Sequence, residues 1–216
     1  MKQASLANHD RQENGKEARF ARIVAAALEV FSEFSFEDAT TEEIARRARV
    51  SKRDIYAQFP DKHALLIETL NQALQTEISN IELTIKRAEK LPSRQRRLEA
   101  IGLAMVNELL SPAMSVLTRL VAAESINRPL VGVVYFENGA VRRTRLISDV
   151  LSRYGAPGDK PSSDTTQAAE HFLALVIHRP ALTTSVGMQD LWNATAKRAH
   201  VLDAVRCFIR AYPEFA

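Results

Sequence analysis

The stretch "ARVSKRDIYAQFPDK", residues 48–62, decides the fold because it combines the spacing of a buried helical face with a strongly basic one. Ile55 and Phe59 lie four residues apart, which predicts the buried side of a short helix over about 52–59. Pro60 ends this helix, since a proline ring cannot continue the hydrogen-bond ladder and displaces the residue before it from the helical region. The remaining faces of the helix therefore carry its charge to the surface.

A second short helix precedes it. Thr40 followed by Glu43 predicts a capping box at the start of a helix over about 41–48, and Ser51 followed by Asp54 repeats the device. Only three residues then separate the two helices. This is the length of a helix-turn-helix, whose second helix normally lies in the major groove of DNA.

The charge pattern agrees with that interpretation. Five cations occur with no acid between Glu43 and Asp54: Arg46, Arg47, Arg49, Lys52 and Arg53. On the later helix, the residues not needed for packing are Lys52, Arg53, Tyr56, Ala57 and Gln58. We therefore expect one side of this helix to lie in the core and the other to face phosphates and base edges.

The rest of the chain has a helical pattern. A first helix is expected over about 17–34, after a tail to residue 16 that we expect to be disordered, and a long fourth helix is expected from Asp61 to Pro92. Later helices are separated by the connections "APGDKPSSD", residues 156–164, and "RPALTTSVG", residues 179–187. Only "LVGVVYF", residues 130–136, is ambiguous, because valine-rich runs favour extended structure.

Composition sets the broader bounds. The 216 residues are 46% hydrophobic and 25% charged, with seven glycines and eight prolines, which favours helix over a multi-stranded sheet. The N-terminus is polar and no apolar run approaches the roughly 20 residues that span a bilayer, so we expect a cytoplasmic protein with no membrane partner. Cys207 is the only cysteine, so no intrachain disulfide can form. The net charge of +3 is a weak indication of an acidic partner.

The longer stretch "IVAAALEVFSEFSFEDATTEEIARRARVSKRDIYAQFPDKHALL", residues 23–66, resembles the DNA-binding segment of TetR/AcrR-type transcriptional regulators. That family typically carries an AA-x-x-x-F helix, a T-x-x-x-IA-x-x-A-x-VS stretch and then Y-x-x-F-x-x-K, and all three are present in order and spacing. The resemblance implies an all-α fold. It places a three-helix DNA-binding domain over residues 1–60 and a helical bundle for dimerisation and ligand sensing over residues 61–216.

The resemblance also implies roles for individual residues. Lys52 and Arg53 are expected to read bases, and Thr41 and Lys62 to hold phosphates at two helix N-termini. The full expected DNA-binding set is Thr41, Arg49, Ser51, Lys52, Arg53, Tyr56, Gln58 and Lys62. Where the family usually has glycine, this chain has Ser35 and Arg49, so a left-handed helix end there carries a penalty on the order of 1 to 2 kcal/mol. Arg49 either adds a phosphate contact or points into solvent.

The C-terminal half is similar to the AefR-like branch of the family in "RLVAAESINRPLVGVVYFENG", residues 119–139. The resemblance implies a repressor that binds an inverted-repeat operator in double-stranded DNA as a homodimer. It also implies that a small, largely apolar effector releases the repressor from DNA by moving the fourth helix. For the effector pocket we expect Met105, Leu109, His171 and Phe172. For the dimer interface we expect Phe172, Val176, Val201, Leu202, Val205, Phe208 and Ile209.

Other functions have weaker support in the sequence. His171 and His178 share a helix face, but hydrogen-bonded interface or pocket histidines are favoured over a metal site, and we expect no metal and no cofactor. No Gly-rich phosphate loop, nucleophile elbow or paired carboxylates occur, so an enzyme is not indicated. Two alternatives remain open at this point: an enzyme or carrier with a merely basic surface, and a helix-turn-helix protein that binds only other proteins.

Overall fold

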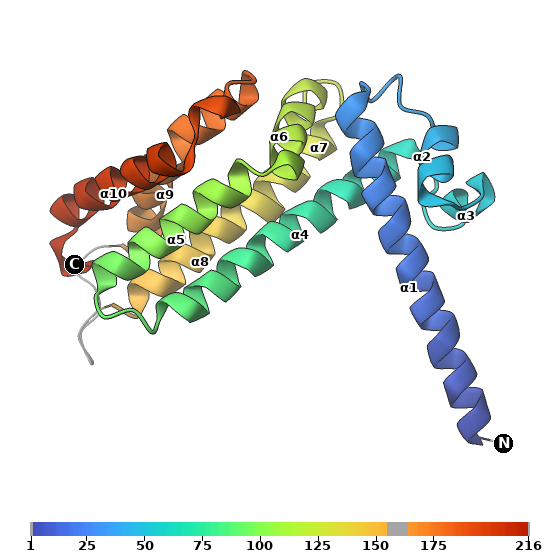
Figure 1. Cartoon of the computed structure of the whole chain (residues 1–216), viewed down its shortest axis with the longest axis horizontal. Helices are drawn as coiled ribbons and strands as arrows, with labels where there is room; N and C mark the ends of the chain where they lie inside the picture. The colour runs from blue at the N-terminus through green and yellow to red at the C-terminus, as the bar shows by residue number, and fades with distance from the viewer. Residues whose placement is uncertain (1, 155–163, 216) are drawn as a thin grey trace. The chain divides into compact units, whose positions relative to one another are not determined.

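The protein is described by a computed structural model that covers residues 2–154 and 164–215. Helices and connecting turns make up these residues and no strand occurs among them, which confirms the all-α prediction (Figure 1). The chain divides into two compact units, residues 1–72 and 73–216. The division falls inside one long helix, α4 (Lys62–Ala88), whereas the family resemblance implies a boundary between residues 60 and 61.

The first unit contains α1 (Lys2–Glu33), α2 (Thr41–Ala48), α3 (Lys52–Tyr56) and the first turns of α4. α2 packs on both α1 and α3. Phe34, which helical spacing predicts to be inward, is 43% exposed. The core of the unit consists of Ile23, Ala26, Ala27, Val30, Phe31, Phe36, Ile44, Ala45, Ala48, Ile55, Phe59, Leu65 and Leu66. This core fixes the orientation of the two short helices.

The start of α1 differs from the prediction. α1 begins at Lys2 instead of near residue 17, so the structure does not show the expected disordered tail over residues 1–16. Residues 2–16 contain no proline and a single glycine, Gly15, so no strong helix breaker interrupts the helix that continues through the core positions.

α3 is shorter than predicted but buries the predicted side chains. It ends at Tyr56, and the amides of Gln58 and Phe59 both donate to the carbonyl of Ile55, at 3.0 and 2.8 Å. Ile55 and Phe59 are buried, as their spacing predicts. The turn before Pro60 therefore completes the packing face without extending the helix.

The turn between α2 and α3 has the strained backbone that the sequence predicts. Arg49 has φ 54° and ψ 49°, and it is the one non-glycine residue with positive φ in the described part of the chain. In this conformation the amides of Arg49 and Val50 donate to the last carbonyls of α2, those of Arg46 and Ala45. The left-handed conformation thus ends α2 and directs the chain into α3.

Ser35 does not adopt the left-handed conformation that its position predicts. α1 ends at Glu33, and the Ser35 hydroxyl donates to the Asp38 carboxylate at 2.7 Å while accepting the Asp38 amide at 3.2 Å. A side-chain capped turn therefore replaces the glycine-type helix end at this position.

The second unit consists of α5 (Arg94–Leu109), α6 (Pro112–Glu124), α7 (Pro129–Tyr135), a π-helix (Phe136–Val141), α8 (Arg142–Ser152), α9 (Thr165–Ser185) and α10 (Ala194–Ala211), with the rest of α4. α9 packs on α5, α6, α8 and α10, and so lies at the centre of the helix contacts (Figure 1). Among the described residues, no single helix is long and apolar enough to cross a membrane, although α5 and α6, bent by 65° where they meet, reach that length and composition together.

Two segments of this unit are more helical than predicted. Residues 130–136, ambiguous in the sequence, are helical in α7 and at the start of the π-helix. The expected connection over residues 179–187 is helix to Ser185, with Pro180 inside α9. Pro180 has no amide to donate to the carbonyl of Val176, and His200 Nε2 of α10 donates to that carbonyl instead, at 2.9 Å. A tertiary hydrogen bond therefore compensates for the proline.

A buried ion pair joins α4 and α8. Arg143 Nη1 donates to both carboxylate oxygens of Glu77 at 2.9 Å, and the side chains are only 8% and 2% exposed. Burial raises the pKa of the Glu77 carboxyl, and the Arg143 guanidinium opposes that shift. Removal of either partner would leave an uncompensated charge in the interior, so the pair fixes the position of α8 along α4.

The strain at Arg49 gives a test of the turn. Arg49→Gly should raise the free energy of unfolding by about 1 to 2 kcal/mol relative to Arg49→Ala, because only glycine adopts positive φ without a steric penalty. Both variants lose the guanidinium, so the comparison isolates the backbone. Urea unfolding followed by circular dichroism measures the difference, and equal midpoints for the two variants would contradict the left-handed turn.

Candidate nucleic-acid interface

The N-terminus of α3 is held by a complete capping box. The Ser51 hydroxyl accepts the Asp54 amide at 3.1 Å, and the Asp54 carboxylate accepts the amide and the hydroxyl of Ser51 at 3.0 and 2.6 Å. The hydrogen bond from the Ser51 hydroxyl is the main cause of the lowered pKa of Asp54. The Ser51 hydroxyl, predicted to contact DNA, is therefore used to begin the helix.

The N-terminus of α2 has half of the predicted capping box. The Thr40 hydroxyl accepts the Glu43 amide at 3.2 Å. The Glu43 carboxylate turns instead to two arginines, accepting from Arg46 at 2.6 and 2.8 Å and from Arg47 at 2.7 Å. These hydrogen bonds, the ones from Arg46 first, lower the pKa of Glu43 to about 2.

Arg47 also binds α1, through two hydrogen bonds of 2.6 Å to the Glu33 carboxylate. Two arginines of α1 also bind the short helices through their guanidinium groups. Arg22 Nε donates to the carbonyl of Ala48 at the end of α2 at 3.3 Å, and Arg19 pairs with Asp54 of α3 at 2.9 Å. This role of the α1 arginines was not predicted, although their three-residue spacing places them on one helix face and is a usable signal.

Lys52 is paired as well. Its ammonium binds the Glu42 carboxylate, and this hydrogen bond is the main cause of both the raised pKa of Lys52 and the lowered pKa of Glu42. Both side chains are about half exposed or more, so the ion pair contributes little to stability and can exchange with water or another anion.

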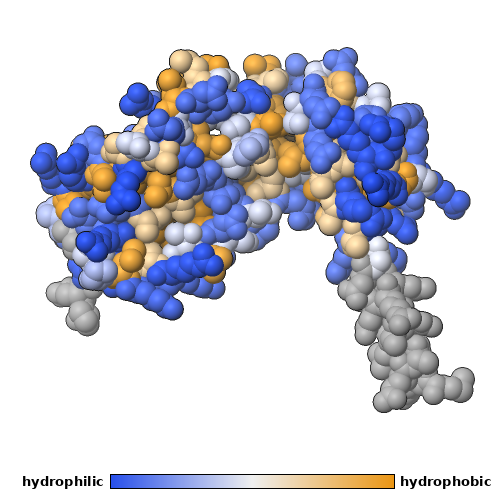
Figure 2. All heavy atoms as spheres, viewed as in Figure 1, coloured by the Kyte–Doolittle hydropathy of each residue, from blue (hydrophilic) through white to orange (hydrophobic). Residues whose placement is uncertain are grey.

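The side chains of Arg49 and Arg53 are the two in the basic stretch that donate no hydrogen bond and form no ion pair among the described residues. Both are exposed, one at the turn and one in the first turn of α3. Hydrophilic residues cover most of the face of α2 and α3 that is seen in Figure 2. The structure thus leaves two guanidinium groups available for an anionic partner at the helix that the sequence predicts to read DNA.

Thr41, Tyr56 and Gln58 border these two arginines. The hydroxyls of Thr41 and Tyr56 share a hydrogen bond of 3.2 Å, with Thr41 buried and Tyr56 48% exposed. Gln58 is exposed and donates to the carbonyl of Asp54 at 3.2 Å. The tyrosine hydroxyl can still accept or donate a second hydrogen bond at the surface.

The ammonium group of Lys62, predicted to bind a phosphate, is already hydrogen-bonded within the protein. Its ammonium donates to the carbonyls of Phe36, Glu37 and Ala39 at 2.6, 3.2 and 2.9 Å, and lies 4.6 Å from the centre of the Phe36 ring. An ammonium has three donors. Lys62 therefore ties the start of α4 to the loop that leads into α2, and its predicted phosphate contact stays a prediction.

The residues expected in the dimer interface lie mostly inside the second unit. Five of them belong to its hydrophobic core: Phe172, Val176, Val201, Val205 and Phe208. Only Leu202 and Ile209 keep some exposed surface. Apolar spacing on a helix does not distinguish a face packed on the same chain from one packed on a second copy, so the expected interface stays a prediction.

The residues expected to bind the effector differ in burial, and their role in binding stays a prediction. Met105, Leu109 and Phe172 are buried in the core, and none of them lines the cavities beside α8 and α9. His171 is exposed and its Nδ1 shares a hydrogen bond of 2.5 Å with the Tyr212 hydroxyl, while His178 lines a cavity. Within the described residues, no three His, Cys, Asp or Glu side chains are grouped as metal ligands would be.

Comparisons with known proteins agree with the geometry of the first unit. The family model described as "Bacterial regulatory proteins, tetR family" matches residues 23–69, and the model described as "AefR-like transcriptional repressor, C-terminal domain" matches residues 96–214, more than half of the chain. The regulator RutR of Escherichia coli K12 is 36% identical over 74 residues. That match spans 34% of this chain and only 35% of RutR.

Two other comparisons cover nearly the whole chain. The regulator BetI of Escherichia coli K12 is 28% identical over 190 residues, 87% of each chain. A solved structure of a TetR-family regulator from Mesorhizobium loti superposes with a TM-score of 0.85 at 20% identity, covering 91% of this chain and 98% of that one. At that identity the likeness shows the fold.

The two-helix motif and these matches define a helix-turn-helix protein that binds DNA and regulates transcription. The chain belongs to the TetR family, with an AefR-like C-terminal domain. Since the proteins it matches are transcriptional regulators, the chain is not an enzyme.

The role of Lys62 can be tested by its stability effect. Lys62→Met keeps the apolar stem but removes the three donors, and should lower the free energy of unfolding by about 1 to 3 kcal/mol, the range for hydrogen bonds to a charged group. Lys16→Met removes an exposed lysine of α1 and serves as the control. Chemical unfolding measures both, and an unchanged midpoint for Lys62→Met would show that the carbonyl contacts do not hold the loop.

Proposed function

We propose that this TetR-family protein is a cytoplasmic repressor that binds an inverted-repeat operator as a homodimer and is released by a small, largely apolar effector. The observation that carries the DNA-binding part is the pairing of charges in the first unit. Arg46, Arg47 and Lys52 are bound to carboxylates, while Arg49 and Arg53 are exposed without a described partner. Unpaired guanidinium groups at the start of a recognition helix favour phosphate and guanine.

The predicted contacts divide into two groups on this basis. Arg53 and Lys52 open α3 and are proposed to read base edges, with Lys52 exchanging Glu42 for DNA. Arg49 and the Tyr56 hydroxyl are proposed to bind phosphates. The groups proposed to complete the contact surface are the Thr41 amide at the N-terminus of α2 and the Gln58 side chain, whereas Ser51 and Lys62 position the helices through their own hydrogen bonds.

The test uses the operator selected from genomic DNA by the purified protein. Arg53→Ala should lower operator affinity by roughly 1 to 3 kcal/mol and relax the preference at particular bases, since it removes a base contact and leaves the fold intact. Arg46→Ala, which removes an exposed arginine already bound to Glu43, is the matched control and should leave base preference unchanged. Affinity and preference are measured by fluorescence anisotropy over single-base operator variants.

If Arg53→Ala binds every variant as the natural protein does, α3 is not the helix that reads the bases. A footprint that shows no inverted repeat would contradict the dimeric operator.

The homodimer is proposed to form through the outer faces of α9 and α10. Leu182 on α9 is 56% exposed, and Leu202 and Ile209 on α10 are only partly buried within their own chain. Self-complementary helix faces of this kind suit a two-fold interface. Two-fold symmetry would place two recognition helices about 34 to 36 Å apart, or a multiple of that spacing, on the operator.

Leu182→Glu should convert the dimer to a monomer at micromolar concentration, because it places a charge in the proposed apolar contact. Leu83→Glu changes a comparably exposed leucine of α4 and is the control. Sedimentation velocity measures both. A Leu182→Glu protein that sediments as the natural one would exclude this face from the interface.

Effector release is proposed to act through α4. Arg143 lines a cavity of about 560 Å³ beside α9, and it also holds Glu77 of α4. α4 is continuous from Lys62 to Ala88, so a shift at Glu77 is passed along one rigid helix. A ligand must bind the released state more tightly, by about 5.5 kcal/mol to change its population from 1:99 to 99:1.

A further inference from the structure

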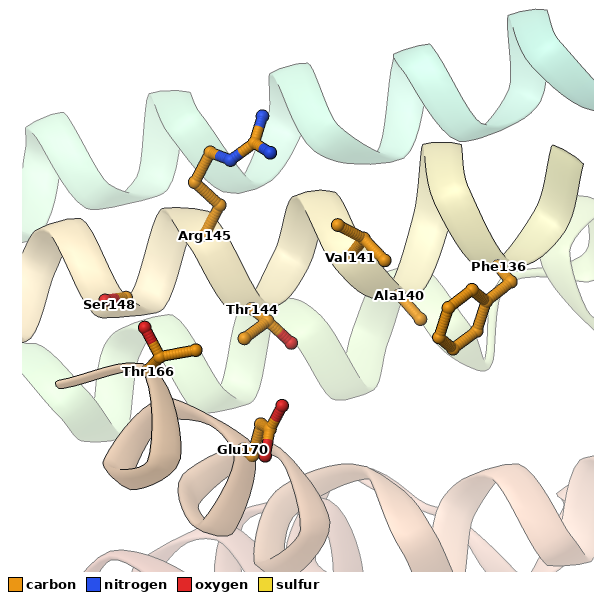
Figure 3. A pocket seen from close by; sticks show the side chains of 8 residues that line it. All are labelled: Phe136, Ala140, Val141, Thr144, Arg145, Ser148, Thr166 and Glu170. Carbon is orange, nitrogen blue, oxygen red and sulfur yellow. The ribbon is translucent and has the colours of Figure 1, made fainter. Parts of the chain in front are cut away.

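Two adjoining cavities lie between α8 and α9, next to the π-helix that precedes α8. Their volumes are about 340 and 560 Å³, within the range of small-molecule sites. Both are lined by Ala140, Thr144 and Glu170, so they form one groove, called here the α8–α9 groove (Figure 3).

The walls of the groove are mainly apolar at both ends. Phe136, which is 59% exposed, lies at one end with Ala140 and Val141 of the π-helix, and Leu173 and Ile177 of α9 line the other. The π-helix inserts one extra residue per turn in the wall, an arrangement that is frequent at functional sites. An apolar body of a ligand would replace water along these surfaces.

The charges of the groove are unequal. Arg143 is neutralised by its buried pair with Glu77, and Figure 3 shows Arg145 pointing away from Glu170 and Thr144. The Glu170 carboxylate lies where the two cavities meet, and it makes no hydrogen bond or ion pair with a described residue. The groove therefore has a carboxylate without an ion pair where its two cavities meet, beside the Thr144 hydroxyl, with apolar surface toward Phe136 on one side and Leu173 on the other.

We propose that the α8–α9 groove binds a small organic cation, an amine whose ammonium group pairs with Glu170 and whose apolar body lies against Phe136 and Ala140 or against Leu173. An ammonium donates to a carboxylate and to hydroxyls, and the Thr144 hydroxyl lines the same space as Glu170. A carboxylate ligand would meet the negative charge of Glu170. This inference rests on the proposed function, since the amine would be the effector.

The groove also contacts the element that the effector must move. Arg143, which lines its larger cavity, is the residue that holds Glu77 of α4. A ligand that displaces α8 relative to α9 changes the position of Arg143, and the buried carboxylate must follow it because an unpaired Glu77 is strongly disfavoured. Binding at Glu170 is thereby linked to α4 through one ion pair.

The probes are three compounds of the same shape with different head groups: 4-phenylbutylamine, 4-phenylbutanol and 4-phenylbutyrate. Isothermal titration calorimetry on the full chain should give the tightest binding for the amine, about fivefold tighter than for the alcohol, the gain expected from one partly exposed ion pair. This preference should weaken with added salt, and the butyrate should bind most weakly.

Variants of Glu170 separate charge from shape. Glu170→Gln should remove the preference for the amine and leave the affinity for the alcohol unchanged. Glu170→Lys should reverse the preference, so that 4-phenylbutyrate binds most tightly. Glu29→Gln removes one exposed carboxylate of α1 and should keep the natural order. An unchanged order of the three probes in Glu170→Gln and Glu170→Lys would overturn the proposal.

Two further measurements distinguish this inference from the proposed function. If a second copy of the chain covers the groove, Glu170→Lys changes the sedimentation coefficient and no probe binds, which overturns the amine site and leaves the DNA-binding function intact. If the amine binds in a Glu170-dependent way and operator affinity stays constant, the binding site is upheld and release by this effector is rejected.

Discussion

The ammonium of Lys62 is the contact on which the geometry of the DNA-binding unit depends. It gathers the carbonyls of Phe36, Glu37 and Ala39, the last residues before the cap of α2, and it is the first residue of α4. The loop therefore has little freedom to change unless the start of α4 moves with it. A lysine suits this position because its three donors can be satisfied by carbonyls that no helix amide reaches.

Charge within this unit is divided between structure and recognition. Glu33 and Glu43 hold Arg47, and Asp54 holds Arg19 and the cap of α3, so these pairs link α1, α2 and α3. Each exposed ion pair of this kind contributes little to stability. Together, however, the pairs determine which cations remain without a carboxylate partner. A segment with as many acids as bases can thus still expose guanidinium groups that form no ion pair with a described residue, because its other cations hold the carboxylates.

The parts of the fold that the sequence predicted were those determined locally. Ser51 and Asp54 form a capping box whatever surrounds them, Ile55 and Phe59 are buried by their spacing, and Arg49 occupies a left-handed position set by the turn. The parts it missed depend on partners remote in the chain. Pro180 stays in a helix because His200 binds the carbonyl of Val176, and Phe172 and Val205 are buried by their own unit, where helical periodicity suggested a second copy. The sequence did not indicate a binding role for Glu170, because a single exposed glutamate becomes a candidate ligand-binding residue only once the cavities on either side of it are known.

The buried pair of Glu77 and Arg143 sets a limit on how α4 can respond to the groove. Burial raises the pKa of Glu77, while the two hydrogen bonds from Arg143 Nη1 to its carboxylate oppose that shift, so the position of the carboxylate depends on the arginine. A small displacement of α8 therefore cannot be absorbed by separating the two charges. Under the proposed release mechanism, Glu77 would move together with Arg143. α4 begins with the lysine that holds the loop before α2, so both of its charged contacts, at Lys62 and at Glu77, would take part in the response that we propose.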